Sequence, residues 1–482
     1  MYPRPVDSGS FPGMSHPFRR WWPEAAVFAF AAVLVFARLP LPLLEPEEGR
    51  YAEIPRQTLH AGQFVTPVYQ GQAYLDKPPL LYWMVMGCYR LFGVHDWSAR
   101  LFPTAAAWLT VLVVYGWGRA VGGRRVGLTA AAVLTFTADF VYRGPMLTMN
   151  GPLGLFITAA LAAGHVACRG GNHWWVASAV CCGLGVLMKG PVAGVLVVPP
   201  LFALRWLDPA VRRPGLLAWV GYAGVVAAVA GPWFVAVAAS EPTFIEHFFF
   251  RHHLTRYVDP FDHSEPWWFY LPQVALSCLP WVLFVIPAVV RRFRVGGEPI
   301  PAVVKLAAVT AGWALVFFSA AGSKRAVYLV PMLPLVATAF GGLIAWGWES
   351  ASVIVRRVSG WSFGLTATAV AAGVLVWLPV YSDQFSVSGV MHRVREAEPT
   401  TALLCYAYQW DALGLYAGDT ALPPLASDTA ELVGQLTGRE RAVVLAHTAA
   451  RRDELVRSLP PGWVWRPVAE SRVAFAGVVC RE

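Results

Sequence analysis

Long apolar stretches separated by short polar connections make up the chain as far as about residue 380. A helix that crosses a lipid bilayer needs about 20 predominantly apolar residues, and most of these stretches approach that length. The pattern therefore predicts an all-α polytopic membrane domain over residues 22–380, with about 11 to 13 transmembrane helices. The predicted spans are 25–44, 96–118, 126–142, 152–168, 174–188, 190–206, 215–238, 267–290, 302–320, 326–346 and 358–380.

A further apolar run, Leu80 to Phe92, is only about thirteen residues long, which is too short to cross a bilayer comfortably. We expect it to form an interfacial or re-entrant helix. If it crossed the membrane, every later connection would change sides, and this would contradict the distribution of arginines described below.

The pattern changes after about residue 381, where hydropathy falls and short elements replace the long apolar runs. Short apolar runs predict strands at 402–408, 441–446 and 473–480, and amphipathic runs predict helices at 427–436 and 449–459. Residues 381–482 are therefore expected to form a small soluble α/β domain of about 100 residues.

Basic residues in the short connections indicate the orientation. They recur on alternate connections, and the excess of Arg and Lys in cytoplasmic loops places those connections inside. The N-terminal tail, residues 1–21, is then cytoplasmic, whereas the loop 45–95 and the domain 381–482 are extracytoplasmic. The arginines concerned are Arg19, Arg20, Arg124, Arg125, Arg169, Arg212, Arg213, Arg291, Arg292, Arg294, Arg356 and Arg357.

The composition also indicates a membrane protein. The 482 residues are 56% hydrophobic and 14% charged, with a mean hydropathy of +0.49, which excludes an ordinary soluble protein. The formal net charge of +9 is dispersed between apolar runs, so it favours loop arginines over a nucleic-acid-binding face. The seven cysteines have no metal-binding spacing, and Cys405 and Cys480 could pair if the C-terminal region is extracytoplasmic.

The predicted outer loop 45–95 holds the most informative charged residues. Glu47 and Glu48 begin a helix-like run that continues with Arg50 and Tyr51. Carboxylates stabilise a helix N-terminus, so a capped surface helix is one interpretation. The functional interpretation is a carboxylate that takes a proton from an acceptor hydroxyl, beside an arginine that binds a phosphate.

Asp76 and Lys77 follow in the same loop, directly before Pro78 and Pro79. Because two prolines fix the backbone, the Lys77 ammonium group is expected near the lipid headgroups. Lysines near helix ends commonly extend their charge toward water, and this interpretation stands beside the binding of a lipid phosphate.

The loop from 241 to 266 collects four histidines and five carboxylates. Such a set could bind a divalent metal, with His252 and His253 as the candidate ligands, but no spacing matches a recognised metal site. Contacts with a phosphate or a sugar are the favoured interpretation of this loop.

Several motifs together resemble a known family. They are Glu47-Glu-Gly-Arg-Tyr-Ala-Glu-Ile, Tyr74-Leu-Asp-Lys-Pro-Pro-Leu-Leu-Tyr-Trp, Leu91-Phe-Gly, Arg100-Leu-Phe-Pro, Gly183-Leu-Gly-Val-Leu-Met-Lys-Gly-Pro and Lys324-Arg-Ala-Val-Tyr-Leu-Val-Pro-Met-Leu-Pro. They resemble the bacterial aminoarabinose transferases of lipid A, which belong with the protein O-mannosyltransferases among the glycosyltransferases that use polyprenyl-phosphate sugars. The resemblance covers about residues 20 to 346.

The resemblance implies a C-type glycosyltransferase fold in the cytoplasmic (inner) membrane of a bacterium. It implies transfer of a sugar from a polyprenyl (undecaprenyl) phosphate to lipid A, another glycolipid or a protein. The transfer is expected to invert the configuration at the sugar carbon. No cofactor is firmly implied. The implied catalytic residues are Glu47, Glu48 and Asp76. The implied lipid-phosphate ligands are Arg50, Lys77, Lys189, Arg256 and Tyr328, and the implied sugar or acceptor contacts are Tyr51, Tyr74 and Asn150.

Three of these positions depart from the family's usual residues. Glu47 stands in place of Asp and Asp76 in place of Glu, and both changes keep the charge. Asn150 also stands in place of Asp, and an amide can orient a sugar hydroxyl but cannot act as a base. Because of this departure, we expect Glu47 and Glu48 to have the larger part in proton transfer.

A transporter or flippase of lipid-linked sugars is the alternative class, and a scaffold that keeps the fold without activity is another. Transporters usually place polar groups near the bilayer midplane on broken helices. The charged clusters of this chain gather at one predicted face instead, which favours the enzyme. Lipid A, another lipid, a polysaccharide and a protein all remain candidate acceptors.

Overall fold

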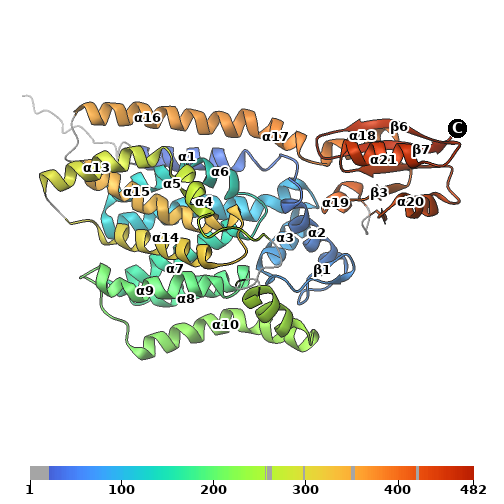
Figure 1. Cartoon of the computed structure of the whole chain (residues 1–482). Helices are drawn as coiled ribbons and strands as arrows, with labels where there is room; N and C mark the ends of the chain where they lie inside the picture. Colours follow the sequence, from blue (N-terminus) through green and yellow to red (C-terminus); the bar gives the residue numbers. More distant parts are fainter. Residues whose placement is uncertain (1–20, 256, 258–262, 297–298, 349–352, 419–422) are drawn as a thin grey trace, which may run out of the picture.

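The computed structural model describes residues 21–482 apart from 256, 258–262, 297–298, 349–352 and 419–422. Its helices lie roughly side by side in a bundle, and a small sheet domain extends from one end of that bundle (Figure 1). The predicted architecture, a helical membrane part followed by a small α/β domain, is confirmed.

Six helical segments of the described chain are long and apolar enough to cross a membrane, and a bent pair gives a seventh if it counts as one span. The six are α4 (Asp96–Gly122), α7 (Asn150–Cys168), α10 (Leu216–Ser240), α14 (Ala302–Ala320), η3 with α15 (Ala326–Met332 and Leu333–Trp348), and α16, η4 and α17 (Val353–Ala372, Gly373–Trp377 and Leu378–Gln384). Four apolar helices are shorter, namely α1 (Trp22–Phe36), α3 (Leu80–Phe92), α8 (Trp174–Lys189) and α9 (Val192–Leu207). Several predicted spans are therefore shorter than a full bilayer crossing.

The predicted single helix at 126–142 is wrong. The segment forms α5 (Arg124–Thr135) and α6 (Ala138–Arg143), with an extended residue, Thr137, between them. The Thr137 hydroxyl accepts a hydrogen bond from the indole N–H of Trp281 at 2.9 Å. A buried polar contact with a distant helix therefore fixes the break, and the apolar pattern of the segment does not record it.

The bent pair lies in the predicted span 267–290. Its halves, α12 (Tyr270–Cys278) and α13 (Trp281–Val295), meet at 79°. The break falls at Leu279 and Pro280, because proline has no N–H for the helical hydrogen bond and disfavours helical geometry in the residue before it.

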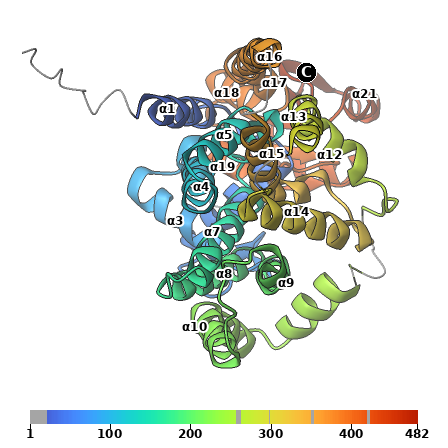
Figure 2. The ribbon, with the colours of Figure 1, turned by 90° about the vertical axis from the view of Figure 1, so that its left-hand side faces the viewer.

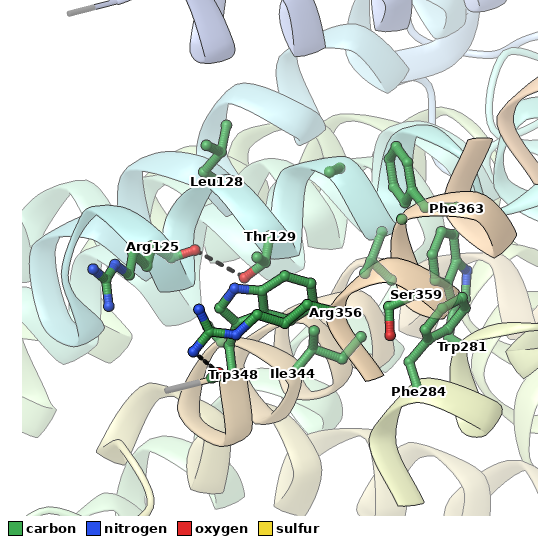
Figure 3. Close-up of a pocket in the computed structure, with 14 residues that line it drawn as sticks. Arg125, Leu128, Thr129, Trp281, Phe284, Ile344, Trp348, Arg356, Ser359 and Phe363 are labelled. Carbon is green, nitrogen blue, oxygen red and sulfur yellow. Dashed lines mark hydrogen bonds between the residues drawn. The ribbon is translucent and has the colours of Figure 1, made fainter. Parts of the chain in front are cut away.

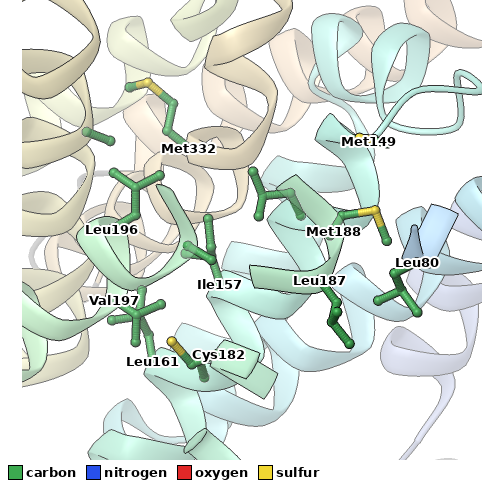
Figure 4. Close-up of a cluster of buried hydrophobic side chains, with 14 of the residues drawn as sticks. Leu80, Met149, Ile157, Leu161, Cys182, Leu187, Met188, Leu196, Val197 and Met332 are labelled. Atoms are coloured by element: carbon green, nitrogen blue, oxygen red, sulfur yellow. The ribbon is translucent and has the colours of Figure 1, made fainter. Parts of the chain in front are cut away.

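Helix α7 lies inside the bundle, whereas α10 lies at its edge beside α8 (Figure 2). Most of α7 is buried, whereas little of α10 is buried. Buried side chains such as Ile157 and Leu161 of α7 pack against Leu196 and Val197 of α9 (Figure 4). Because lipid is as apolar as leucine, close packing and interhelical hydrogen bonds, more than the exclusion of water, hold such helices together.

Gly341 marks one such close approach, between α15 and α5. Its carbonyl oxygen accepts a hydrogen bond from the Thr129 hydroxyl at 2.7 Å. A Cβ atom at position 341 would lie 2.4 Å from the backbone N and Cα of Ala130, so only glycine fits without moving a helix.

The sheet domain contains one five-stranded sheet in the order β4-β3-β5-β7-β6. Its elements are α18 (Ser388–Ala397), β3 (Leu403–Tyr406), α19 (Leu413–Ala417), β4 (Leu425–Ala426), α20 (Thr429–Leu436), β5 (Arg441–Ala446), α21 (Ala449–Ser458), β6 (Trp463–Glu470) and β7 (Phe475–Arg481). Strands β4, β3 and β5 are parallel, and β5, β7 and β6 are antiparallel. The three predicted strands and two predicted helices are all present.

Cys405 and Cys480 do not pair, and all seven cysteines are free thiols. Cys405 lies in β3 opposite Leu445, and Cys480 lies in β7 opposite Arg441. Strand β5 thus separates them, and two strand spacings amount to about 10 Å. A disulfide needs Cα atoms within about 7 Å.

The two ends of the bundle differ in their polar groups. Helix α2 (Glu47–His60), the hairpin of β1 (Val68–Tyr69) and β2 (Gln72–Ala73), and the sheet domain lie at one end (Figure 1). The arginine-bearing connection between α9 and α10 and the last turn of α13, which holds Arg292 and Arg294, lie at the other.

An apolar cavity of about 720 Å³ lies between α5, α13, α15 and α16, away from the sheet domain. Trp281, Phe284 and Phe363 surround it, with Arg125 and Arg356 also in its lining (Figure 3). Its walls are mostly hydrophobic, so it lacks the convergent polar groups that chemistry requires.

Replacing Gly341 with alanine is expected to lower the melting temperature of the purified protein. The added methyl group would separate α15 from α5 at a cost of about 1–3 kcal/mol, which exceeds the gain in helix propensity of about 1 kcal/mol. Gly312→Ala in α14 is the matched control, because its Cβ would meet nothing within 4 Å. Equal melting temperatures for the two variants would contradict the close approach.

Candidate active site

Helix α2 begins the polar region at the sheet-domain end of the bundle. Glu47 and Glu48 occupy its first turn, where carboxylates stabilise the N-terminus. Residues three and four apart share one face of a helix, whereas consecutive residues do not, so Glu47 lies with Arg50 and Tyr51 and Glu48 faces elsewhere. The helix therefore separates the two neighbouring carboxylates.

A polar cavity of about 490 Å³ lies beside the Glu47 face of α2. The predicted site residues that line it are Glu47, Arg50, Tyr51, Tyr74, Asp76, Lys77, Asn150, Lys189 and Tyr328. They come from the outer loop, from the first residue of α7, from the last residue of α8 and from η3. The fold therefore brings distant segments of the chain together at one cavity. Residues of the predicted loop 241–266 also line it, as do Ser323 and Arg325.

Cationic side chains outnumber carboxylates in the described lining of this cavity. Five cations, Arg50, Lys77, Lys189, Arg251 and Arg325, lie with two carboxylates, Glu47 and Asp76. An excess of fixed positive charge in a partly enclosed site attracts an anionic ligand.

Two hydrogen-bonded pairs hold the carboxylates of the cavity. Arg325 donates from Nη2 to Oε1 of Glu47 at 2.5 Å, and both side chains are partly exposed. Asp76 Oδ1 lies 2.8 Å from Nε2 of His247. Each carboxylate is thus oriented by a partner from a distant segment of the chain.

Lys189 contacts Asn150 and Tyr328 across the cavity. Its ammonium group donates to Oδ1 of Asn150 at 2.5 Å and lies 4.3 Å from the ring centroid of Tyr328. The first contact is a hydrogen bond to a neutral amide, and the second is a cation–π interaction. Together they fix the position of the ammonium group, and neither partner carries a negative charge.

Glu48 lies outside the cavity and its side chain is fully buried. Its Oε2 lies 2.6 Å from Nη2 of Arg100 and 3.4 Å from Nη2 of Arg38. The carboxylate also accepts hydrogen bonds from the backbone N–H groups of Leu44 and Leu147. Burial alone would raise the pKa of Glu48, but the two guanidinium groups lower it well below its usual range. This carboxylate is enclosed within the fold and does not line the cavity, and the catalytic role of Glu48 stays a prediction.

The predicted phosphate ligand Arg256 lies outside the described residues, as do the side chains of His252 and His253. Their roles stay predictions. Across the part of the chain that is described, no group of three or more His, Cys, Asp or Glu side chains is placed to hold a metal ion.

Sequence reasoning missed two carboxylates near α2, Asp411 and Glu45. Arg50 donates from Nε to Oδ2 of Asp411 at 3.2 Å, and the Tyr69 hydroxyl donates to the other oxygen of Asp411. Glu45 accepts a hydrogen bond from the backbone N–H of Ala412 at 2.7 Å. Neither carboxylate could be found from a local pattern, because each depends on contact between the outer loop and the sheet domain.

Comparison with known proteins supports the motif-based resemblance. The family described as dolichyl-phosphate-mannose-protein mannosyltransferase matches residues 76–235. The undecaprenyl phosphate-alpha-4-amino-4-deoxy-L-arabinose arabinosyl transferase 1 of Sodalis glossinidius is 31% identical over 384 residues, which cover 75% of this chain and 67% of the relative. The chain belongs to the polyprenyl-phosphate-sugar glycosyltransferase family. The predicted resemblance is thus confirmed.

A second relative agrees in sequence, and a solved structure agrees in fold. The protein of the same name from Pseudomonas fluorescens is 29% identical over 373 residues, 74% of this chain, and the chain spans 64% of that relative's length. The crystal structure of ArnT from Cupriavidus metallidurans bound to undecaprenyl phosphate has a TM-score of 0.73 at 21% identity, covering 95% of this chain and 98% of that one. The chain therefore has the membrane fold of this glycosyltransferase family.

Glu45 gives a prediction about stability and pH. Burial raises the pKa of this carboxyl from 4.5 to about 8, and the charge of Asp411 adds to the shift. Between these values the folded protein holds a proton that the unfolded chain has released, so stability falls as pH rises through that window. The melting temperature of Glu45→Gln, which cannot ionise, should fall less than that of the natural protein between about pH 5.5 and 8.5.

Thermal unfolding in one detergent, measured at several pH values, checks this expectation. The control is Glu246→Gln, an exposed carboxylate that lies outside the cavity lining. It should follow the natural protein at every pH. A parallel loss of stability in Glu45→Gln and the control would contradict the assignment.

Proposed function

We propose that this protein is a membrane glycosyltransferase that moves a sugar from a polyprenyl phosphate donor to an acceptor of the bacterial envelope. The cavity with five cations and two carboxylates carries the proposal. A phosphate linked to a lipid and a sugar supplies the negative charge that this lining lacks, and charge-assisted hydrogen bonds to phosphate are strong.

The cations have a direct role in the proposed reaction. When the bond between the sugar carbon and the phosphate oxygen breaks, the phosphate leaves with the electron pair and gains negative charge. Arg50, Lys77 and Lys189 contact this phosphate, and Tyr328 helps to position Lys189. Fixed cations stabilise the leaving anion more than the bound donor, and this difference lowers the barrier. Arg256 stays a proposed further contact.

Glu47 is the proposed general base. Its carboxylate takes the proton of the acceptor hydroxyl as that oxygen attacks the sugar carbon from the side opposite the phosphate, so the product has inverted configuration. Arg325 orients the Glu47 carboxylate through their 2.5 Å hydrogen bond. Asp76, whose carboxylate is hydrogen-bonded to His247, is the second carboxylate of the cavity and assists Glu47 in the proposed proton transfer.

The remaining predicted residues have positions suited to the sugar or the acceptor. Tyr51, Tyr74 and Asn150 line the same cavity. Aromatic rings suit the apolar faces of sugars, and the Asn150 amide keeps an N–H₂ group for a hydroxyl while its oxygen accepts from Lys189. These contacts fit a sugar held between the phosphate ligands and Glu47.

The relatives support the donor class, because their names specify an undecaprenyl phosphate-linked aminoarabinose. We infer the cytoplasmic membrane as the location, with the N-terminus inside and the cavity and sheet domain outside. Lipid A, another glycolipid and a protein are the proposed acceptor classes. The alternative, a transporter of lipid-linked sugars, would move the donor intact, so release of undecaprenyl phosphate from labelled donor in the presence of acceptor separates the two functions.

Glu47→Gln is expected to reduce sugar transfer at least about 100-fold, because a glutamine cannot take the acceptor's proton. Affinity for undecaprenyl phosphate should stay within about twofold of the natural protein, since Glu47 does not bind the phosphate in this mechanism. Turnover with labelled undecaprenyl phosphate-aminoarabinose and lipid A measures the effect. Glu246→Gln serves as the control, and undiminished turnover in Glu47→Gln would remove Glu47 from the role of base.

Lys77→Ala is expected to weaken the binding of undecaprenyl phosphate about tenfold, the order that one charge-assisted hydrogen bond contributes. A direct binding measurement with undecaprenyl phosphate in detergent tests this. Lys305→Ala provides a matched control, since Lys305 lies near the start of α14 and does not line the cavity. Unchanged affinity in Lys77→Ala would refute the assignment of Lys77 to the phosphate.

A further inference from the structure

Residues 409–416 of the sheet domain contact the outer loop and the residues just before it. Within it, Trp410, Ala412 and Leu413 are fully buried and Asp411 is 8% exposed. The segment comes between β3 and β4, so the edge of the sheet domain reaches the polar end of the bundle.

Backbone and side-chain bonds fix the residues that follow Asp411. The Ala412 N–H donates to Glu45, and the Leu43 N–H donates to the hydroxyl of Tyr416 at 3.0 Å. Gly414 lies so close to α2 that a Cβ there would be 2.6 Å from Oε1 of Glu53. The segment therefore has one position relative to α2, and that position is set by groups outside the cavity.

Asp411 connects this fixed segment to the cavity. Its carboxylate receives hydrogen bonds from Nε of Arg50 and from the Tyr69 hydroxyl. Arg50 lines the cavity, whereas neither Asp411 nor Tyr69 does. The side chain of Asp411 is 10% exposed and that of Arg50 is 47% exposed, so the carboxylate holds the buried edge of a guanidinium whose remainder is open to a ligand.

We propose that Asp411 is a positioning residue through which the sheet domain orients Arg50 for the lipid phosphate. The inference rests on the proposed function and assigns the sheet domain a part in it. Because the contact with Asp411 uses Nε, it fixes the plane of the guanidinium and directs the terminal amino groups as a pair, which is the geometry that a phosphate accepts.

Asp411 also has a second effect, which changes the affinity for the phosphate in the opposite direction. Its negative charge lies near the phosphate position and would repel the ligand, so removal of the charge alone would tighten binding. Orientation of Arg50 predicts weaker binding in Asp411→Asn, and simple charge neutralisation predicts stronger binding. The direction of the change therefore decides between the two.

The test uses the full-length protein in detergent and direct binding of undecaprenyl phosphate. Asp411→Asn should bind about tenfold more weakly than the natural protein, and Tyr69→Phe should weaken binding in the same direction by less. Asp453→Asn is the control, because Asp453 pairs with Arg452 on the surface of the sheet domain. Unchanged or tighter binding by Asp411→Asn would overturn the inference.

A double-mutant cycle shows whether Asp411 acts through Arg50. If it does, Arg50→Gln with Asp411→Asn binds no more weakly than Arg50→Gln alone, whereas independent effects would multiply. A merely structural role would weaken phosphate binding by the double variant further and lower its melting temperature, and that result would also overturn the inference.

If the natural protein does not bind undecaprenyl phosphate, the proposed function fails. If the natural protein binds undecaprenyl phosphate, and Arg50→Gln weakens this binding but Asp411→Asn does not, then this inference alone fails.

Discussion

The buried carboxylate of Glu48 is the constraint on which the polar end of the molecule depends. It is fully enclosed, paired with Arg100 of α4 and Arg38, and bonded to the backbone at Leu44 and Leu147. An ionised group in such a place is tolerated only when its hydrogen bonds are complete, and loss of one partner of a buried pair costs about 3–5 kcal/mol. These contacts tie α2 to two connections, the one that precedes α2 and the one that precedes α7. They thereby also fix the residues on the opposite face of α2.

The same constraint explains why two adjacent carboxylates have different environments. Consecutive helical residues point about 100° apart, so when Glu48 is fixed inside, Glu47 must face the cavity. There it meets Arg325, which comes from the segment before η3. The position of a candidate base is therefore set by the burial of its neighbour.

Much of the fold follows from local pattern. The apolar run at 152–168 corresponds to α7, and the predicted strand at 441–446 is β5. The failures have two physical causes. The break at Thr137 involves contact with the distant residue Trp281, which no window of sequence contains. Strand β6 was missed because it is an edge strand with a half-exposed, mixed pattern, although its partner β7 is its neighbour in sequence.

The site divides in the same way. Motifs identified Lys189, Tyr328 and the candidate residues of the outer loop, and all of these except Glu48 line one cavity. The partners that orient them are less visible, since Asp411 lies 361 residues from Arg50 and His247 lies 171 from Asp76. Charge type can be predicted from a motif, whereas the pairing that decides how a charge points requires the fold.

Asn150 illustrates what such a pairing changes. From the sequence, an amide in this position removes a possible base but can still orient a sugar hydroxyl. In the structure its oxygen accepts from Lys189, so the amide orients the ammonium group without neutralising it. A carboxylate in the same place would form an ion pair and reduce the excess of positive charge in the cavity. The amide therefore strengthens the attraction of the cavity for a phosphate, since the ligand itself supplies the negative charge that the protein omits.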